Sequence, residues 1–119
     1  MEHRILIVDD DPGAREALSS ILTDEGFQVT CAADGQEALD YLRSEPPPCL
    51  ILLDLTMPVM DGWEFRSAQK RDPTLASIPV VVLTATNLSD ETETAIDGAA
   101  IVPKPIDFDV LLSAVQRHC

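Results

Sequence analysis

The stretch Cys49-Leu-Ile-Leu-Leu-Asp-Leu-Thr-Met-Pro58 decides the fold of this chain. Five apolar residues in succession lead into Asp54, and prolines at positions 46–48 and 58 bound the run. A continuous apolar run of this length is typical of a strand that is buried on both faces of a parallel sheet. Asp54 is therefore predicted at the carboxyl end of a central strand. Ligands bind at that edge of open α/β sheets, so Asp54 is the first candidate functional residue.

Four more strands are predicted. Residues 4–9 and 79–84 are apolar runs that end in an acid and in a hydroxyl, while residues 27–32 alternate weakly. Residues 101–104 form a short last strand, and Pro103 within it indicates an edge position. Helices are expected between the strands, at residues 12–25, 37–44, 63–70 and 87–97, and a final helix is expected from residue 108 onward.

The sequence marks the ends of several helices and the character of two of them. Asp11, Asp34 and Asp107 are predicted N-caps, and Gly26 is predicted to end the first helix. The last helix carries Phe108 among its apolar positions. The helix at residues 87–97 is polar with a thin apolar stripe, which makes it a candidate moving part.

Strands and helices thus alternate five times without an internal linker. Because crossovers between parallel strands are right-handed, the helices should cover both faces of one sheet. The predicted fold class is α/β, a doubly wound five-stranded parallel sheet. The 119 residues suffice for one domain, which we place at residues 1–119.

Composition limits the class of protein. The net charge of −13 disfavours direct binding to nucleic acid or to anionic membranes. It reflects either general solubility or a cluster of acids that binds a cation. No apolar run reaches the ~20 residues of a membrane span, and the amino terminus does not resemble a signal peptide, so we expect a cytoplasmic protein. Cys31, Cys49 and Cys119 are interpreted as reduced thiols, two of them in the core, rather than as a disulfide.

The ends of the predicted strands carry the candidate site. In a parallel sheet the residues that end each strand meet at one edge, and these are Asp9, Asp10, Asp54, Thr84 and Lys104. Two carboxylates 4 Å apart repel by about 4 kcal/mol at an effective dielectric of 20. A lysine or a divalent cation relieves that repulsion, and hard oxygen ligands suit Mg²⁺ with a phosphate as co-ligand. The alternative is that each acid only caps a helix or turn.

The motifs Val8-Asp-Asp10, Leu53-Asp-Leu-Thr-Met-Pro58 with Met60-Asp-Gly62, Leu83-Thr-Ala85 and Lys104-Pro105 occur in this order. Together they resemble the receiver domain of bacterial two-component response regulators, in the manner of a chemotaxis regulator. The resemblance covers essentially the whole chain. It implies a flavodoxin-like (βα)5 fold with strand order 2-1-3-4-5.

The resemblance also implies a set of roles around a phosphoryl group. Asp54 would accept it from a histidine of a sensor kinase or of a phosphotransfer protein. Asp10 would bind Mg²⁺ directly, Asp9 would bind it through water or as a second ligand, and the carbonyl of Thr56 would complete the protein's ligands.

Signal output is implied by the same resemblance. Lys104 would pair with the phosphoryl group, and its peptide bond to Pro105 would be cis. Thr84 would move toward the phosphoryl oxygen. The face formed by the fourth helix, the last strand and the last helix would then shift and bind an output protein.

Three departures from the family pattern bear on this output. Ile101 stands where an aromatic switch residue is usual, so the coupling of Thr84 to the output face is expected to differ. The segment at residues 98–104 is one residue shorter than usual. Thr56 and Thr86 replace residues that are often acids or amides, and we hypothesise that they orient an attacking water poorly and prolong the phosphorylated state.

Two other functions are compatible with the same residues. The first is a Mg²⁺-dependent phosphohydrolase with Asp54 as nucleophile, but the general acid of that class would stand at position 56, which is Thr56. The second is a receiver-like interaction module that is never phosphorylated, against which the complete set of strand-end residues argues. We therefore expect a switch rather than an enzyme, with at most self-phosphorylation from small phosphodonors and self-dephosphorylation.

Overall fold

A sheet of five parallel strands forms the centre of the computed structural model, which describes residues 3–55, 59–84 and 100–119. The strand order is β2-β1-β3-β4-β5, which confirms the predicted order, and every pair is parallel. β5 lies at an edge, as its proline predicted. The strand bounds are β1 Arg4–Val8, β2 Gln28–Ala32, β3 Leu50–Asp54, β4 Val80–Thr84 and β5 Ala100–Pro103.

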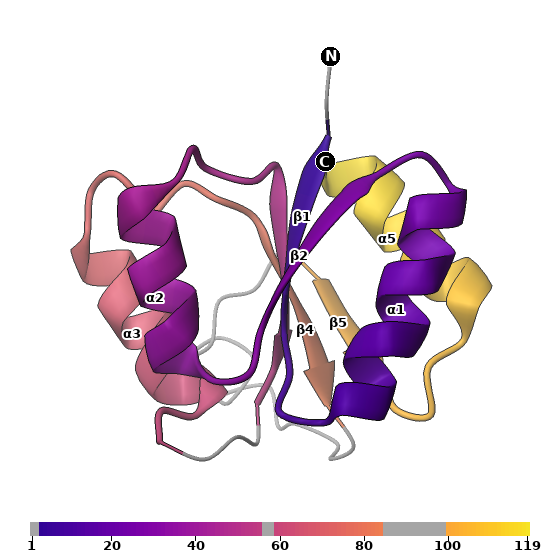
Figure 1. Cartoon of the computed structure of the whole chain (residues 1–119), viewed down its shortest axis with the longest axis horizontal. Helices are drawn as coiled ribbons and strands as arrows, with labels where there is room; N and C mark the ends of the chain where they lie inside the picture. The colour runs from indigo at the N-terminus through magenta and orange to yellow at the C-terminus, as the bar shows by residue number, and fades with distance from the viewer. Residues whose placement is uncertain (1–2, 56–58, 85–99) are drawn as a thin grey trace.

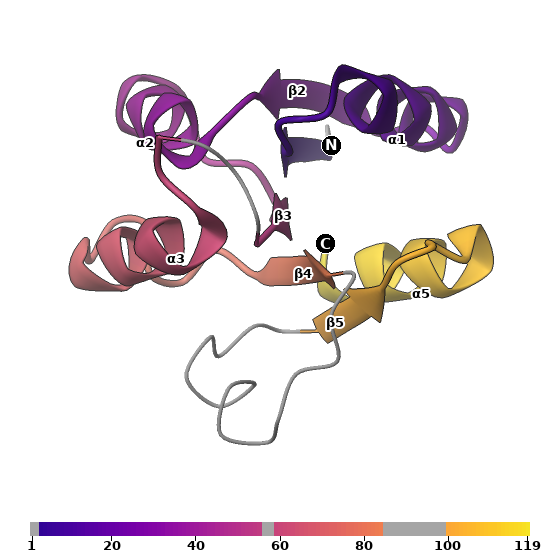
Figure 2. The same ribbon diagram turned by 90° about the horizontal axis from the view of Figure 1, so that it is seen from below.

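Helices cover both faces of this sheet, as predicted (Figure 1). In Figures 1 and 2, α2 and α3 lie on one side of the strands, and α1 and α5 lie on the other. The fourth helix expected at residues 87–97 lies outside the described residues. The described helices are α1 Pro12–Asp24, α2 Gly35–Ser44, α3 Gly62–Arg71 and α5 Phe108–His118.

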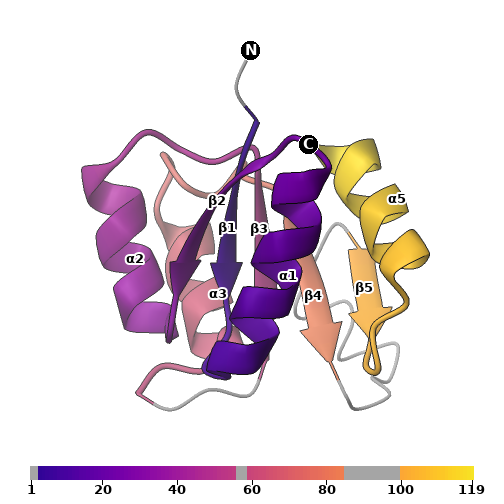
Figure 3. The same cartoon turned by 45° about the vertical axis from the view of Figure 1, so that its right-hand side comes forward.

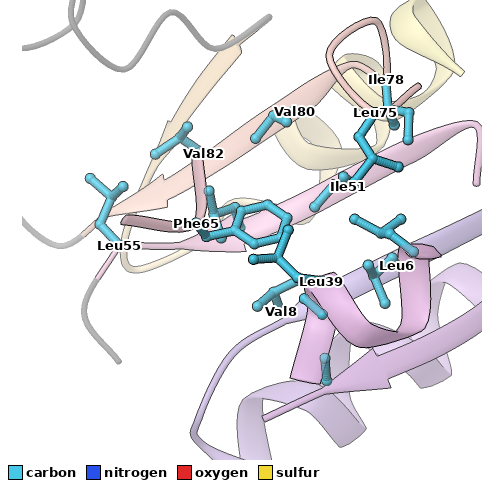
Figure 4. Close-up of a cluster of buried hydrophobic side chains, with 14 residues drawn as sticks. Leu6, Val8, Leu39, Ile51, Leu55, Phe65, Leu75, Ile78, Val80 and Val82 are labelled. Carbon is cyan, nitrogen blue, oxygen red and sulfur yellow. The ribbon is translucent and has the colours of Figure 1, made fainter. Parts of the chain in front are cut away.

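The central strands are apolar throughout because both of their faces are covered. All five residues of β3 and of β4 are buried. Their side chains alternate between two cores, one under α2 and α3 and the other under α1 and α5. Phe65 of α3 is fully buried in the first core, among Val8, Leu39 and Ile51 (Figure 4). This packing fixes the strands, and therefore fixes where their carboxyl ends lie.

The predicted N-caps are present. The carboxylate of Asp34 accepts a hydrogen bond from the backbone N–H of Glu37 at 2.9 Å, and Asp11 and Asp107 cap α1 and α5 in the same way. Asp61 and Glu64 form a capping box at the start of α3. The last helix departs from its prediction at one position, since Phe108 is 45% exposed. Phe108 opens α5 next to its cap, where the helix has not yet reached the second core.

The prediction for the cysteines was wrong. Cys49 and Cys119 form a disulfide that joins residues 70 positions apart, with their Cα atoms 5.0 Å apart. This separation lies within the ordinary range for a disulfide. The pair forms because α5 runs back along the sheet and ends beside the first residues of β3 (Figure 3). Cys49 and Cys119 are partly buried against the second core, whereas Cys31 has a free thiol and is exposed.

Within the described residues, no helix has the length and apolar character needed to cross a bilayer.

One close contact ties α3 to the end of β3. The backbone N–H of Gly62 donates to the carbonyl of Leu55 at 2.9 Å. A Cβ at position 62 would lie 2.7 Å from the carbonyl oxygen of Asp54 and 2.7 Å from the Cα of Leu55. Both neighbours are backbone atoms, so they yield only if the strand end itself moves.

We therefore expect Gly62→Ala to destabilise the protein by about 2–3 kcal/mol, because the added methyl group overpacks a backbone contact. Gly13→Ala is the matched control, since a Cβ there meets its nearest neighbour, an oxygen of Asp11, at 3.4 Å. Urea unfolding of the two variants and the parent measures the difference. Equal midpoints for all three proteins would show that the end of β3 is not held by this contact.

Candidate functional site

Three carboxylates meet where β1 and β3 end. Asp9 directly follows β1 and Asp54 is the last residue of β3, and the two strands pair with Val8 opposite Leu53. One carboxylate oxygen from each of Asp9, Asp10 and Asp54 lies within 4.8 Å of the others. Figure 2 views the molecule from this edge of the sheet. The structure thus brings together the three acids that the sequence placed at strand ends.

Asp9 is the most constrained of the three acids. It is 1% exposed, and its Oδ1 accepts a hydrogen bond from the N–H of Asp11 at 2.9 Å. Its backbone carbonyl accepts a hydrogen bond from Nη1 of Arg15 at 2.7 Å. Its second oxygen, Oδ2, is buried and has no hydrogen-bond partner among the described residues. Buried polar atoms are rarely left without a partner, so this oxygen is a candidate ligand atom for a cation.

Lys104 supplies the opposite charge. Its Nζ lies 3.4 Å from Oδ1 of Asp54 and 3.7 Å from Oδ2 of Asp9. Its backbone N–H donates to the carbonyl of Thr84 at 2.8 Å, which fixes the residue after β5 against the end of β4. The peptide bond from Lys104 to Pro105 is cis. The ammonium group therefore lies between a buried carboxylate and the less buried Asp54.

The remaining predicted residues are distributed as follows. Thr84 is the last residue of β4 and is 6% exposed. Ile101 of β5 is half-buried and packs against the first core. Thr56 and Thr86 lie outside the described residues, so their predicted roles stay predictions.

The charges of this site suit a hard divalent cation. Asp9, Asp10 and Asp54 offer carboxylate oxygens, and one ammonium group offsets only part of their charge. Mg²⁺ binds through a few such oxygens and keeps several waters. Asp10 is exposed and Asp9 is buried, so the cluster has an open side toward solvent. The residues present therefore fit Mg²⁺.

Arg15 was missed by the sequence analysis. It is the single basic residue of α1, and the helical pattern gave no reason to turn it toward the site. In the structure its guanidinium donates a hydrogen bond to the carbonyl of Asp9, in the peptide bond that joins Asp9 to Asp10. One signal could have indicated this role of Arg15: it is a lone basic residue, one turn into the helix that follows two acids.

Almost the whole chain matches a known protein family. The sequence matches the family model described as "Response regulator receiver domain" over residues 5–116. This chain is a receiver domain of the response regulator family.

The relatives include response regulators that are longer than this chain. Response regulator Rre1 of Synechocystis sp. is 38% identical over 118 residues, and the match covers 95% of this chain and 50% of Rre1. Response regulator MprA of Mycobacterium tuberculosis is also 38% identical, with 98% of this chain and 50% of MprA covered. The chain therefore spans about half the length of these curated relatives.

Solved structures share the fold. Chemotaxis response regulator CheY4 of Vibrio cholerae has a TM-score of 0.91 and 30% identity, with both chains fully covered. Response regulator TrrA of Thermotoga maritima, solved in complex with Mg²⁺ and BeF, has a TM-score of 0.86 and 32% identity, with 98% of this chain and 99% of TrrA covered.

If the three carboxylates repel one another, Asp10→Asn should stabilise the cation-free protein. We expect its melting temperature to rise by about 2–4 °C, and the further rise that Mg²⁺ produces in the parent to shrink or vanish. Asp24→Asn, on the exposed last residue of α1, is the control and should keep the full Mg²⁺ response. Melting curves with and without Mg²⁺ decide this. An Asp10→Asn protein that responds to Mg²⁺ like the parent would remove Asp10 from the ligand set.

Proposed function

We propose that this receiver domain is a phosphorylation-dependent switch in which Asp54 is the phosphoacceptor. The supporting observation is the position of its carboxylate, which has the Lys104 ammonium at 3.4 Å and two further carboxylates within 4.8 Å. The donor is a phosphohistidine of a sensor kinase or of a phosphotransfer protein. An oxygen of Asp54 attacks phosphorus, the P–N bond breaks, and the imidazole leaves with that electron pair.

Asp9, Asp10, Asp54 and the carbonyl of Thr56 are the proposed Mg²⁺ ligands. The bound cation would neutralise charge on the transferred group. The buried Oδ2 of Asp9, which has no hydrogen-bond partner among the described residues, and the exposure of Asp10 support this assignment. Arg15 positions the backbone between the two acids through its 2.7 Å hydrogen bond.

Lys104 neutralises charge on the other side of the phosphoryl group. Transfer of this kind depends mostly on positioning and electrostatics, so a preorganised ammonium contributes directly to rate. In the absence of the phosphoryl group, the same ammonium lies close to both Asp54 and Asp9 and offsets part of the repulsion between their carboxylates. Phosphorylation would give Lys104 a stronger partner.

The proposed output passes from Thr84 to the surface around β5 and α5. Thr84 and Lys104 are already joined by a backbone hydrogen bond, so a change at one strand end reaches the other. A hollow of about 410 Å³ lies between β5 and α5, with Ile101, Val110 and Ala114 in its lining. Val110 is 49% exposed and offers an apolar contact to an output protein. Converting a rare conformation into the dominant one takes about 5.5 kcal/mol of differential stabilisation.

Ile101 is the proposed point of difference from other receiver domains. Its half-buried side chain packs against the first core instead of presenting an aromatic ring. We propose that output here depends on movement of the strand and helix as a unit, rather than on rotation of a single ring.

The direct test is intact mass after incubation with Mg²⁺ and acetyl phosphate as a small phosphodonor. We expect a gain of one phosphoryl group in the parent protein, no gain in Asp54→Asn, and full gain in the control Asp40→Asn, whose acid is exposed on α2.

Two outcomes of that experiment would contradict the switch. Continuous release of phosphate, with Asp54 as nucleophile, would indicate a phosphohydrolase instead. No mass change with acetyl phosphate or with a phosphorylated histidine donor would indicate an interaction module.

The lifetime of the phosphorylated state gives a second test. Because Thr56 is proposed to orient an attacking water poorly, Thr56→Asn should shorten the half-life by about fivefold, the effect of one hydrogen bond of ~1 kcal/mol. The measurement is loss of the phosphoryl group with time, in parallel with a Thr74→Asn control in the loop after α3. A shorter half-life in the parent than in Thr56→Asn would refute the role given to Thr56.

A further inference from the structure

A second cluster of potential metal ligands lies at the opposite edge of the sheet. His3 precedes β1, Cys49 precedes β3 and Cys119 follows α5. One ligand atom from each of these side chains lies within 4.8 Å of the others. Figure 1 shows the C-terminal end beside the start of β1, away from the strand ends that carry Asp9 and Asp54. The two clusters are therefore separated by the length of the strands.

Backbone hydrogen bonds fix the three residues independently. The carbonyl of His3 accepts from the N–H of Gln28 at 2.9 Å, and the N–H of Cys49 donates to the carbonyl of Arg4 at 2.8 Å. The N–H of Cys119 donates to the carbonyl of Val115 at 2.9 Å, which continues the hydrogen-bond pattern of α5 to Cys119. A metal site built here would need little rearrangement of the backbone.

The side chains also have suitable positions. The ring of His3 stands edge-on to Phe27, with centroids 6.3 Å apart and an interplanar angle of 72°. Its Nδ1 lies 3.9 Å from Sγ of Cys119. A tetrahedral zinc ion, with bonds of about 2.3 Å to sulfur and about 2.0–2.1 Å to nitrogen, places those two ligand atoms about 3.6 Å apart. The observed separation is already close to that value.

The disulfide defines when such a site can exist. Cys49 and Cys119 are half-buried against the second core and are bonded to each other in this structure. Reduction by a dithiol converts the disulfide into two thiols and the dithiol into its own disulfide. Binding of a divalent cation then releases two protons and leaves two thiolate ligands. Cation binding and the disulfide are therefore mutually exclusive.

We propose that His3, Cys49 and Cys119 form a second metal site, which binds one thiophilic divalent cation of the Zn²⁺ type when the two cysteines are reduced. Water would occupy the fourth position. Two sulfurs and an imidazole select a softer cation than the oxygen ligands of the Asp9, Asp10 and Asp54 cluster. The proposal does not depend on phosphorylation of Asp54.

The test is Zn²⁺ binding to the full chain, after reduction by a dithiol and removal of the reductant. Saturating Mg²⁺ occupies the acidic cluster, and a chromophoric chelator competes for Zn²⁺. We expect one tightly bound Zn²⁺ per reduced chain and none in the oxidised chain. Co²⁺ in place of Zn²⁺ should give the absorption of a tetrahedral thiolate complex.

Three variants separate the ligands. Cys49→Ser should abolish tight binding, and His3→Ala should weaken it at least tenfold while both cysteines remain able to form the disulfide. Cys31→Ser is the matched control and should bind like the parent, since Cys31 lies on β2 outside the cluster. Although Cys31 is exposed, partial desolvation of its thiol raises the pKa of that group, an effect that the charge of Arg15 opposes.

Either of two results would overturn the proposal. One is reduced parent protein that binds no more Zn²⁺ than Cys49→Ser. The other is a Zn²⁺ affinity in His3→Ala equal to that of the parent, which would show that His3 is not a ligand.

Discussion

Mutual repulsion among three carboxylates is the constraint on which the rest of the site depends. Asp9 and Asp54 are almost fully buried, so water screens their charges poorly. The sheet nevertheless holds them together, because β1 and β3 are neighbours and both strands end at these residues. Lys104 reaches them because it directly follows β5, which pairs with β4. The arrangement leaves one buried oxygen of Asp9 without a hydrogen-bond partner among the described residues, and a cation would satisfy it.

Much of this arrangement follows from local sequence. An apolar run that ends in an acid specifies both a buried strand and a polar group at its carboxyl end, so Asp9 and Asp54 could be placed at one edge before any coordinates were known. Aspartates ahead of apolar periodic segments likewise predicted the caps at Asp11 and Asp34, which the structure confirms. These predictions succeeded because each depends on residues that are adjacent in the chain.

The features that could not be predicted depend on tertiary contacts. The disulfide joins cysteines 70 positions apart, and their pairing requires the exact direction of α5. Arg15 reaches the site across a turn of α1, which helical periodicity does not encode. Gln69 is fully buried because its amide donates to the carbonyls of Leu75 and Ile78, in a loop with no repeating pattern. Local signals carry no information about such distant partners.

We propose that one edge of the sheet holds a divalent cation and a phosphoryl group side by side. A crystal structure of this protein grown with Mg²⁺ and beryllofluoride, which mimics a phosphoryl group on a carboxylate, tests it most directly. We expect beryllofluoride bonded to an oxygen of Asp54 and in contact with Lys104, with the cation bound by Asp9 and Asp10. Beryllofluoride or the cation bound elsewhere, with the carboxylate of Asp54 left unmodified, would show that this edge of the sheet is not the phosphoryl site.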